Sequence, residues 1–492
     1  MPGARGRRWF AVPGARKLAA AGVLAVAIAG PATPTASAAE ATRVVSAFDD
    51  DNRFDFNLTL SFLHEAKSAF IKREQAVTLT NAAGDSVTRN ELVKDLQYKQ
   101  TRNVLGLRAD FGVLRDVGFH VEAPIVLTDD RELDFDQSLG GDCPNNFPGQ
   151  VPIPTCVNGQ NSTARLDGIG SYPGMMSSAS NYGLDAKHNR QYQAPSQTYF
   201  SGPTRSGIEY LGLGLDWAIF NQVRDDTKPT FKVGFDTRLD VSKDMRFDPL
   251  NPGGNTAVGL GYHQLIWSTT VSKRFRHFDP YFGAWYMLPV RSNGSPFQKY
   301  PVGGQTAVEP QQQAGVQMGF EQIAWERPSV QQRVTVEFRA HMQEHFYGRS
   351  HTELWEALSG SPQCATDVTK CRADPSMAGA NYGIDFDGNT PSPHPGVTET
   401  EAYASFGGNA GVNIQVGRYI RFRGVVGLTI DTPHFITFAN AGVDKDGSGA
   451  VELTNPNEKN PTYREIIDNP GRRFRVEGTQ IWSGMVEGSL MF

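Results

Sequence analysis

Ionisable side chains recur at every second position in several segments of this sequence. Between residues 333 and 343, the odd positions include Arg333, Glu337, Arg339 and His341, while most even positions are apolar. Because alternate side chains of a β-strand share one face, such segments predict strands with one ionised and one apolar face. Ionised faces brought together could form ion pairs or line a polar passage. The candidate lining residues are Arg108, Asp110, His120, Glu122, Lys232, Asp236, Arg238, Arg333, Glu337, Arg339, His341, Arg421, Arg423, Arg475 and Glu477.

The same alternation along the chain predicts an all-β protein. It is clear in residues 54–62, 117–127 and 231–241, where Phe, Leu, Val and Ile occupy one face. Many of the segments reach ten residues or more. Strands of ordinary globular proteins have about five or six residues, whereas strands of this length are suited to crossing a membrane. We expect twelve strands, at about 53–65, 97–111, 115–128, 206–220, 230–243, 258–275, 280–290, 314–326, 331–346, 400–416, 420–432 and 473–492.

The connections between these strands alternate in length. Short connections lie near 112–116, 221–229, 276–280, 327–330 and 417–419, and long ones near 129–205, 291–313, 347–398 and 433–471. Outer-membrane barrels have short periplasmic turns and long external loops, whereas a soluble sandwich, the alternative for alternating strands, need not sort its loops. We therefore expect a closed antiparallel transmembrane β-barrel with an even number of strands, about twelve, over residues 53–492.

Two roles are open for the ionised faces if the apolar faces contact lipid. An Arg or Lys at the bilayer midplane costs about 2–4 kcal/mol, so the ionised faces must point into the barrel. There they either line a wet pore and set its selectivity, or pair across a narrow interior and fill it. Twelve strands enclose a modest lumen. Aromatic residues near strand ends, such as Trp217, Trp267, Tyr281, Trp285 and Trp482, fit interfacial girdles, with ordinary strand aromatics as the alternative.

The N-terminus predicts export. Residues 1–38 combine five basic residues, a 13-residue apolar run from Leu18 to Gly30 and the small-x-small triplet Ala36-Ser37-Ala38, which together predict a cleaved signal peptide. An uncleaved anchor is the alternative. After cleavage, residues 39–52 would form a short periplasmic segment. Without the five basic residues, 42 basic residues face 52 acidic ones, a balance that argues against nucleic acid as a partner. No later apolar run reaches 18 residues, so we expect no transmembrane helix.

The four cysteines form two local pairs in segments rich in Pro, Gly, Asn and Ser. Cys143 is near Cys156, and Cys364 is near Cys371. In an exported protein, these pairs predict two disulfides within the long external loops. A zinc site is the alternative, but neither pair has a CxxC spacing or a nearby cluster of histidines.

One long loop is expected to contain a short helix. Ser350-His351-Thr352-Glu353 has the pattern of a capping box and precedes Leu354–Leu358. Such a helix would either fold over or into the barrel mouth, or pack only within its own loop.

The end of the chain resembles the C-terminal strand of bacterial outer-membrane β-barrel proteins. Trp482, Val486, Leu490 and the terminal Phe492 would share one face of that strand. The resemblance covers about the last ten residues. It implies that the terminal aromatic residue is recognised by the barrel-assembly machinery, and that the protein resides in the outer membrane of a Gram-negative bacterium in contact with its lipid.

Residues 444–455 resemble the calcium-binding loop of EF-hand proteins. Asp444, Asp446, Ser448, Ala450 and Glu452 match ligand positions, and Gly449 matches the turn. Asn455 replaces the bidentate Glu of the last position, and no flanking helices are evident. The resemblance implies a Ca²⁺ site in an external loop; a plain polar, glycine-rich loop is the alternative. We expect no other cofactor.

These observations favour an outer-membrane channel for passive or weakly selective uptake of small solutes. A non-conducting barrel whose external loops serve adhesion or scaffolding is the second hypothesis. A membrane-embedded hydrolase is a remote third, since some outer-membrane phospholipases are twelve-stranded barrels. We do not expect an enzyme: there is no G-x-S-x-G motif, and His341 and His345 on one strand would lie about 13 Å apart, too far to share a metal.

Overall fold

The computed structural model describes most residues after position 38. The described residues are 39–48, 54–80, 85–137, 157, 162–166, 198–247, 252–297, 299–300, 303–359, 384–385, 391–392 and 395–492. The predicted signal peptide, residues 1–38, and the predicted disulfide partners Cys143, Cys156, Cys364 and Cys371 lie outside them. Within these ranges, no helix is both long and apolar enough to cross a bilayer.

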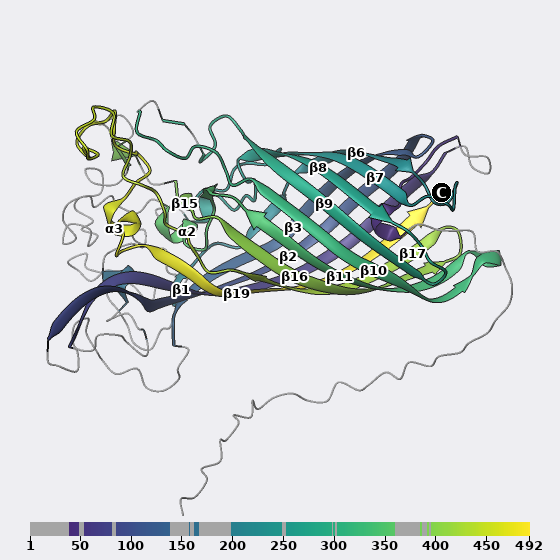
Figure 1. Cartoon of the computed structure of the whole chain (residues 1–492), viewed down its shortest axis with the longest axis horizontal. Helices are drawn as coiled ribbons and strands as arrows, with labels where there is room; N and C mark the ends of the chain where they lie inside the picture. Colours follow the sequence, from purple (N-terminus) through teal and green to yellow (C-terminus); the bar gives the residue numbers. More distant parts are fainter. Residues whose placement is uncertain are drawn as a thin grey trace, which may run out of the picture. The chain divides into compact units, whose positions relative to one another are not determined.

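Twelve long antiparallel strands in the described part of the chain close into a barrel (Figure 1). In chain order they are β1 (Phe56–Thr80), β2 (Ser86–Leu114), β3 (Val117–Phe135), β6 (Leu211–Phe220), β7 (Thr230–Leu239), β8 (Tyr262–Ser272), β9 (Phe278–Arg291), β10 (Gln313–Arg327), β11 (Gln332–His345), β16 (Tyr403–Val416), β17 (Ile420–Asp431) and β19 (Phe474–Met491). Consecutive members of this series pair with one another, and β1 pairs with β19, from Asn57 opposite Met491 to Arg73 opposite Phe474. The predicted fold class is confirmed.

Smaller elements belong to the connections. They are η1 (Glu40–Thr42), α1 (Thr163–Leu166), β4 (Thr198–Ser201), β5 (Arg205–Ile208), η2 (Pro252–Gly254), η3 (Pro328–Val330), β12 (Gly348–Ser350), α2 (Trp355–Leu358), β13 (Ile384–Asp385), β14 (Pro391–Ser392), β15 (Thr398–Thr400), β18 (His434–Phe435) and α3 (Glu465–Asp468). Apart from η1 and η3, all of them lie in the long connections.

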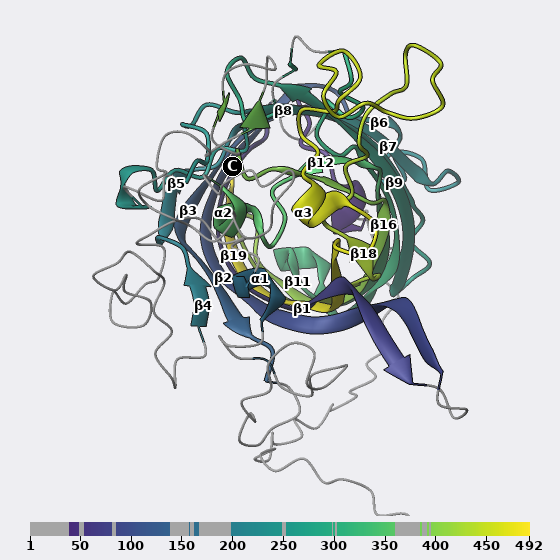
Figure 2. The ribbon, with the colours of Figure 1, turned by 90° about the vertical axis from the view of Figure 1, so that its left-hand side faces the viewer.

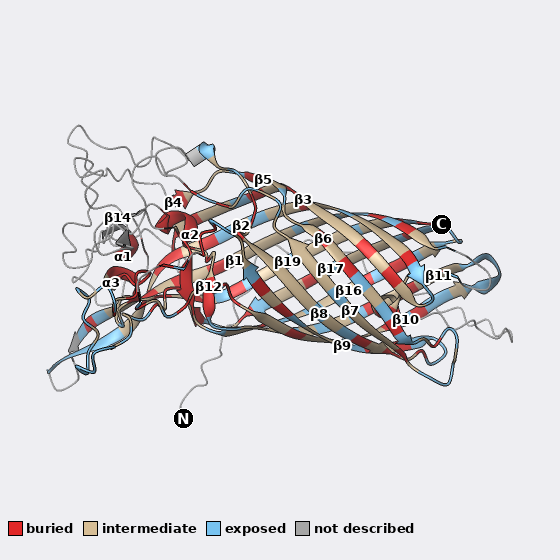
Figure 3. Cartoon of the chain, turned by 90° about the horizontal axis from the view of Figure 1, so that it is seen from above, coloured by how far each residue is buried: buried red, intermediate tan, exposed pale blue. Residues whose placement is uncertain are grey.

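Apolar side chains of the barrel strands point outward. On β1, Leu58, Leu60 and Phe62 are exposed, while Thr59 between them is buried and its Oγ1 lies 2.9 Å from Ser489 Oγ on β19. Figure 3 shows the same change of burial from residue to residue along the other strands. Further exposed apolar residues are Leu107, Leu127, Leu215, Trp217, Phe235, Trp267, Phe282, Met318, Phe338, Met342, Phe406, Val412, Ile414, Phe422, Val426, Ile430, Trp482, Val486 and Leu490.

This outward apolar surface requires a lipid environment. Soluble monomers rarely expose contiguous apolar patches of more than a few hundred Å², whereas here the exposed residues come from strand after strand around the ring. Two stacked sheets would bury these faces against each other, so the sandwich alternative is excluded. The closed ring also pairs the backbone groups of the strands internally, as the hydrocarbon core demands. The protein is therefore an outer-membrane β-barrel.

Short turns join the strands at one end of the barrel. Arg115 and Asp116 alone connect β2 to β3, and η3 connects β10 to β11. Asp116, Gln331 and Gly417 in three of these turns have φ values of 61°, 52° and 77°, the left-handed backbone that tight turns use. Residues Phe56 and Met491, where the barrel begins and ends, lie at the same end, since Phe492 and Phe56 exchange backbone hydrogen bonds. By the usual sorting of turns and loops, this end is periplasmic.

The hairpin of β1 and β2 extends further than its sequence pattern predicted. The two strands pair continuously from Phe56 opposite Phe111 to Thr80 opposite Ser86, whereas the predicted strands covered only 53–65 and 97–111. The outer part of this hairpin projects from the extracellular end (Figures 1 and 2). Its inward apolar residues, such as Ile71 and Leu96, are fully buried against other parts of the chain, and charged residues are frequent on both strands, so the lipid-facing alternation disappears.

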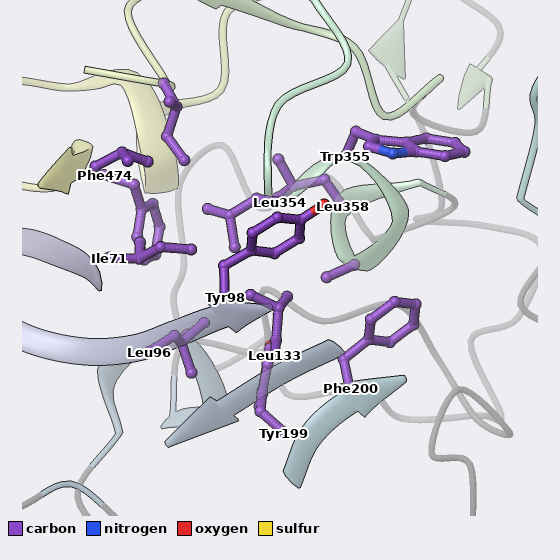
Figure 4. Packing of buried hydrophobic residues seen from close by; sticks show 14 of the residues in the cluster. Ile71, Leu96, Tyr98, Leu133, Tyr199, Phe200, Leu354, Trp355, Leu358 and Phe474 are labelled. Atoms are coloured by element: carbon purple, nitrogen blue, oxygen red, sulfur yellow. The ribbon is translucent and has the colours of Figure 1, made fainter. Parts of the chain in front are cut away.

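A hydrophobic cluster lies at the extracellular mouth, and we call it the mouth cluster (Figure 4). Inward residues of the long strands β1–β3 contribute Ile71, Tyr98 and Leu133, and the helices α2 and α3 bring apolar residues from distant loops. Seen along the barrel, α2 and α3 lie within the ring of strands (Figure 2). Other members are Leu96, Phe135, Tyr199, Phe200, Leu354, Trp355, Leu358, Ile436, Ile466, Ile467, Phe474 and Val476.

A buried ion pair joins α2 to the rim of the barrel. Arg205 Nε donates to Glu356 Oε1 at 2.6 Å, and the Arg205 guanidinium lies 4.8 Å from the ring centroid of Trp355. The predicted helix is thus present and fills the mouth. The predicted cap is wrong: Ser350 belongs to β12, its hydroxyl lies 2.8 Å from that of Thr400 on β15, and α2 has no side-chain cap.

Replacement of an outward apolar residue by arginine tests the orientation of the strands. Val426, in the middle of β17, is 64% exposed, and Val223, in a periplasmic turn, is 57% exposed. Val426→Arg should lower the free energy of unfolding in lipid vesicles by about 2–4 kcal/mol, because the new charge would meet hydrocarbon. Val223→Arg should change it by less than about 0.5 kcal/mol, because this side chain meets water. Equal effects of the two substitutions would contradict a lipid-facing β17.

Candidate functional site: the charged lumen

The interior of the barrel carries most of the ionised residues predicted to line it. They alternate along their strands with the exposed apolar residues, and most of them form ion pairs on the same strand or with a strand one or two places away in the ring. Arg108, Asp110, His120, Glu122, Lys232, Asp236, Arg238, Arg333, Glu337, Arg339, His341, Arg421 and Arg423 all occupy inward positions.

One group of inward charges centres on His120 of β3. Its Nε2 lies 2.7 Å from Asp236 Oδ1 on β7, and its Nδ1 lies 3.6 Å from Asp216 Oδ2 on β6. Lys232 Nζ approaches Asp216 Oδ1 at 3.4 Å. Gly214 on β6 leaves room for the contact between His120 and Asp236, because a Cβ at this position would lie 2.2 Å from the His120 ring and from Asp236 Oδ1. The lining therefore pairs acids and bases across three strands.

A second group centres on Glu337 of β11, which is 3% exposed. Its Oε1 accepts hydrogen bonds from Tyr281 Oη and Arg339 Nη2, each at 2.6 Å, and its Oε2 accepts one from Arg423 Nη2 at 2.8 Å. The expectation that Tyr281 and Trp285 belong to an outer aromatic girdle is wrong for both residues, and Trp285 lies beside Gly315 on the inward side of β9. Residues 279, 281 and 283 of β9 are buried while Phe278 and Phe282 are exposed, so Tyr281 points inward.

Residues 39–48 enter the periplasmic end of the lumen. The backbone N–H of Glu40 donates to Glu321 Oε1 on β10 at 2.6 Å, Arg421 on β17 donates to the Glu40 carboxylate, and Thr42 Oγ1 lies 2.6 Å from Ser272 Oγ on β8. Because β8, β10 and β17 are not neighbours in the ring, the segment bridges the lumen. Burial alone would raise the pKa of Glu40, but the guanidiniums of Arg421 and Arg43 outweigh it and lower that pKa to about 2.

Two glycines allow this segment to lie against the wall. A Cβ on Gly112 would lie 1.9 Å from the carbonyl oxygen of Ser46, and one on Gly118 would lie 2.8 Å from that of Val45. The sequence had predicted a short periplasmic segment over 39–52, and no pattern indicated that it enters the barrel. Glu40, Glu321 and Asp216 are thus lumen residues that the alternation analysis did not select.

A cavity of about 260 Å³ lies between this segment and the wall. Its lining combines bases and acids from at least four barrel strands with Glu40 and Arg43 of the segment. The wall residues include Asn57, Thr59, Arg108, Asp110, His120, Asp216, Lys232, Arg421, Arg423 and Glu487. The ion pairs therefore do not fill the interior completely.

Two predicted lining residues, Arg475 and Glu477 of β19, lie on the other face of the wall. The ladder between β1 and β19 shifts register between Ser68 and Phe70, next to Gly478, whose φ is 63°. A bulge of this kind reverses which side chains face inward. Beyond it, Val476 is fully buried in the mouth cluster, and Glu477 instead forms an ion pair with Lys72 at 2.5 Å.

The remaining predicted site residues are not part of the lumen network. His341 lies inward with its Nε2 3.1 Å from Thr429 Oγ1. Asp444, Asp446, Ser448, Ala450 and Glu452 lie in the external connection between β17 and β19, where Glu452 is exposed. Phe492, the predicted assembly signal, is exposed next to the closing ladder, with its ring centroid 6.0 Å from that of Phe56.

Comparisons with known proteins give structural likenesses only. No family model matches the sequence, and no curated protein matches it. An outer membrane channel of Pseudomonas putida F1 is similar at a TM-score of 0.33 and 8% identity, covering 89% of this chain and 96% of that one. A FadL homologue of Pseudomonas aeruginosa is similar at 0.28 and 9%, covering 89% and 90%. The outer membrane protease OmpT of Escherichia coli is similar at 0.28 and 7%, covering 92% and 100%. Likenesses at this level carry no argument about function.

Removing the central carboxylate of the second group should destabilise the barrel. In Glu337→Gln, the partly buried guanidiniums of Arg339 and Arg423 lose the buried carboxylate that both contact. Loss of one partner of a buried ion pair typically costs about 3–5 kcal/mol. The control is Glu309→Gln, since Glu309 forms an ion pair with Arg291 at 2.9 Å but its side chain is 52% exposed. This change should cost less than about 1 kcal/mol. Urea unfolding in vesicles measures both, and a Glu337→Gln variant as stable as its control would refute the role of Glu337 as a buried hub.

Proposed function

We propose that this protein is an outer-membrane channel for small solutes, with both ends of its lumen closed by its own segments. The observation that carries the proposal is the incompletely filled, charged interior behind residues 39–48. A barrel whose charges served only to fill space would leave no cavity of about 260 Å³ lined by both signs.

The contacts of residues 39–48 are of a kind that can be exchanged for water. The segment is held by side chains such as Glu40, Thr42 and Arg43, together with a backbone hydrogen bond from the N–H of Ala47 to the carbonyl oxygen of Leu114, and it adds no strand to the barrel. Polar contacts to a wet lumen contribute little net free energy, because water replaces them when they open. Displacement of the segment would join the cavity to the periplasm.

The opposite end is closed by apolar packing. Each large side chain buried in the mouth cluster contributes roughly 1.5–3 kcal/mol, so this closure is the more stable of the two. We propose that passage requires α2 and α3 to move away from the ring. Because drug-sized ligands occupy pockets of about 300–1,000 Å³, a cavity of this size suits water, ions and small polar solutes.

Planar-bilayer recording of a variant that lacks residues 39–48 tests the proposal. Deletion should increase the frequency or size of unit conductance steps relative to the intact protein, because it removes the material that bridges the periplasmic end. Asp226→Ala, which removes an exposed carboxylate from a turn at the same end, should leave conductance unchanged. If the intact protein and the deleted variant are both silent at all voltages, the channel is excluded, and the second hypothesis of a surface barrel with adhesive or scaffolding loops is favoured.

A further inference from the structure

The external connection between β17 and β19 brings three carboxylates together. One carboxylate oxygen from each of Asp444, Asp446 and Glu458 lies within 4.8 Å of the other two. The chain returns on itself here, since the N–H of Val443 donates to the carbonyl oxygen of Glu458 at 2.9 Å. Two arms of the loop that are separate in sequence thus meet at one point.

Glu458 is the unusual member of this group. It is 1% exposed, and its Oε2 accepts a hydrogen bond from the backbone N–H of Glu452 at 3.0 Å. Its Oε1 is buried and has no hydrogen-bond partner among the described residues. A buried carboxylate with an unpartnered oxygen is costly, and a cation bound by this carboxylate and the two neighbouring ones would remove that cost.

The two aspartates are held in place by the backbone. Asp444 accepts hydrogen bonds from the N–H groups of Gly447 and Gly449, each at 2.8 Å, and these donors lower its pKa. Asp446 accepts one from the N–H of Ser448 at 2.9 Å. In the described part of the chain, no lysine or arginine forms an ion pair with any of the three carboxylates, and the neighbouring Lys445 ammonium lies against Gly303 of another loop.

We propose that Asp444, Asp446 and Glu458 bind one Ca²⁺ ion. All three ligands are hard oxygen donors, with neither His nor Cys among them, which selects Ca²⁺ or Mg²⁺ over zinc or copper. Ca²⁺ accepts irregular shells of six to eight oxygens, and the exposed side of this group leaves room for water ligands. Glu458 supplies a carboxylate three residues beyond the position that Asn455 occupies in the EF-hand comparison, and the exposed Glu452 takes no part.

The site lies next to contacts that reach the barrel mouth. Asn460, two residues after Glu458, donates from Nδ2 to Glu399 Oε1 on β15 at 3.0 Å. β15 pairs with β12, which directly precedes the segment that forms α2. A bound cation would therefore fix the two arms of the loop beside the connections that close the lumen.

Calcium binding to the refolded full-length barrel in Ca²⁺-free detergent buffer tests the site. Isothermal titration with CaCl₂ should give one site with a Kd of about 10⁻⁴–10⁻³ M, the range of extracellular calcium modules. Glu458→Gln should weaken binding at least about tenfold, since loss of even an outer-shell partner has that effect. The matched control is Glu452→Gln, in the same loop, which should bind as the intact protein does. Heat-modifiable migration on gels verifies that each variant forms the barrel.

Trypsin cleavage after the exposed Lys445 gives an independent readout. Ca²⁺ should slow this cleavage in the intact protein and in Glu452→Gln, and should have no effect in Glu458→Gln. MgCl₂ in place of CaCl₂ should bind more weakly, because Mg²⁺ demands a regular octahedral shell. The proposal is overturned if the intact protein binds no Ca²⁺ at CaCl₂ concentrations about tenfold above the expected Kd range. It is also overturned if Glu452→Gln loses Ca²⁺ binding as fully as Glu458→Gln.

Discussion

Strands that cross a bilayer must satisfy every backbone N–H and C=O group within the protein, because hydrocarbon offers no hydrogen-bond partner. In this chain the requirement is met by the ladder between the first and the last barrel strands, which runs from Asn57 opposite Met491 to Arg73 opposite Phe474. Without it, β1 and β19 would each present an open edge to lipid. Strands with period-two alternation then have only one stable orientation in the wall, with their apolar side chains toward lipid and their ionised side chains toward the lumen.

The interior follows from this closure. The lumen of a twelve-stranded barrel is too wide to be filled by apolar side chains of the strands alone. It is still narrow enough for long side chains on different strands to contact one another. Charged side chains bridge part of it, as around His120 and Glu337. Residues 39–48 cross its periplasmic end, and α2 and α3 fill its extracellular end. Glycines at the closest approaches, such as Gly112 beside Ser46, make room for the crossing segment.

The twelve barrel strands and the inward face of most of them were predictable from the sequence. Each strand contacts lipid on one side and the polar lumen on the other, so apolar and polar residues must alternate along it. Arg475 and Glu477 were misplaced because a single bulge beside Gly478 reverses the faces, and nothing in the alternation reports a bulge. The outer β1–β2 hairpin was missed because protein, rather than lipid, covers its apolar face. The positions of residues 39–48 and of Glu458 depend on contacts between residues far apart in the sequence. For Glu458, the concentration of acidic residues between positions 444 and 458 was the one available signal.

Lipid contact of individual tryptophans tests the orientation of the wall most directly. Trp482 on β19 is 57% exposed on the outer face, whereas Trp285 on β9 occupies an inward position beside Gly315. Variants that retain only one of these tryptophans can be folded into vesicles whose acyl chains carry bromine, a quencher that acts on contact. The structure predicts strong quenching of Trp482 and little quenching of Trp285. Equal quenching of the two, or stronger quenching of Trp285, would contradict the closed barrel with an apolar exterior.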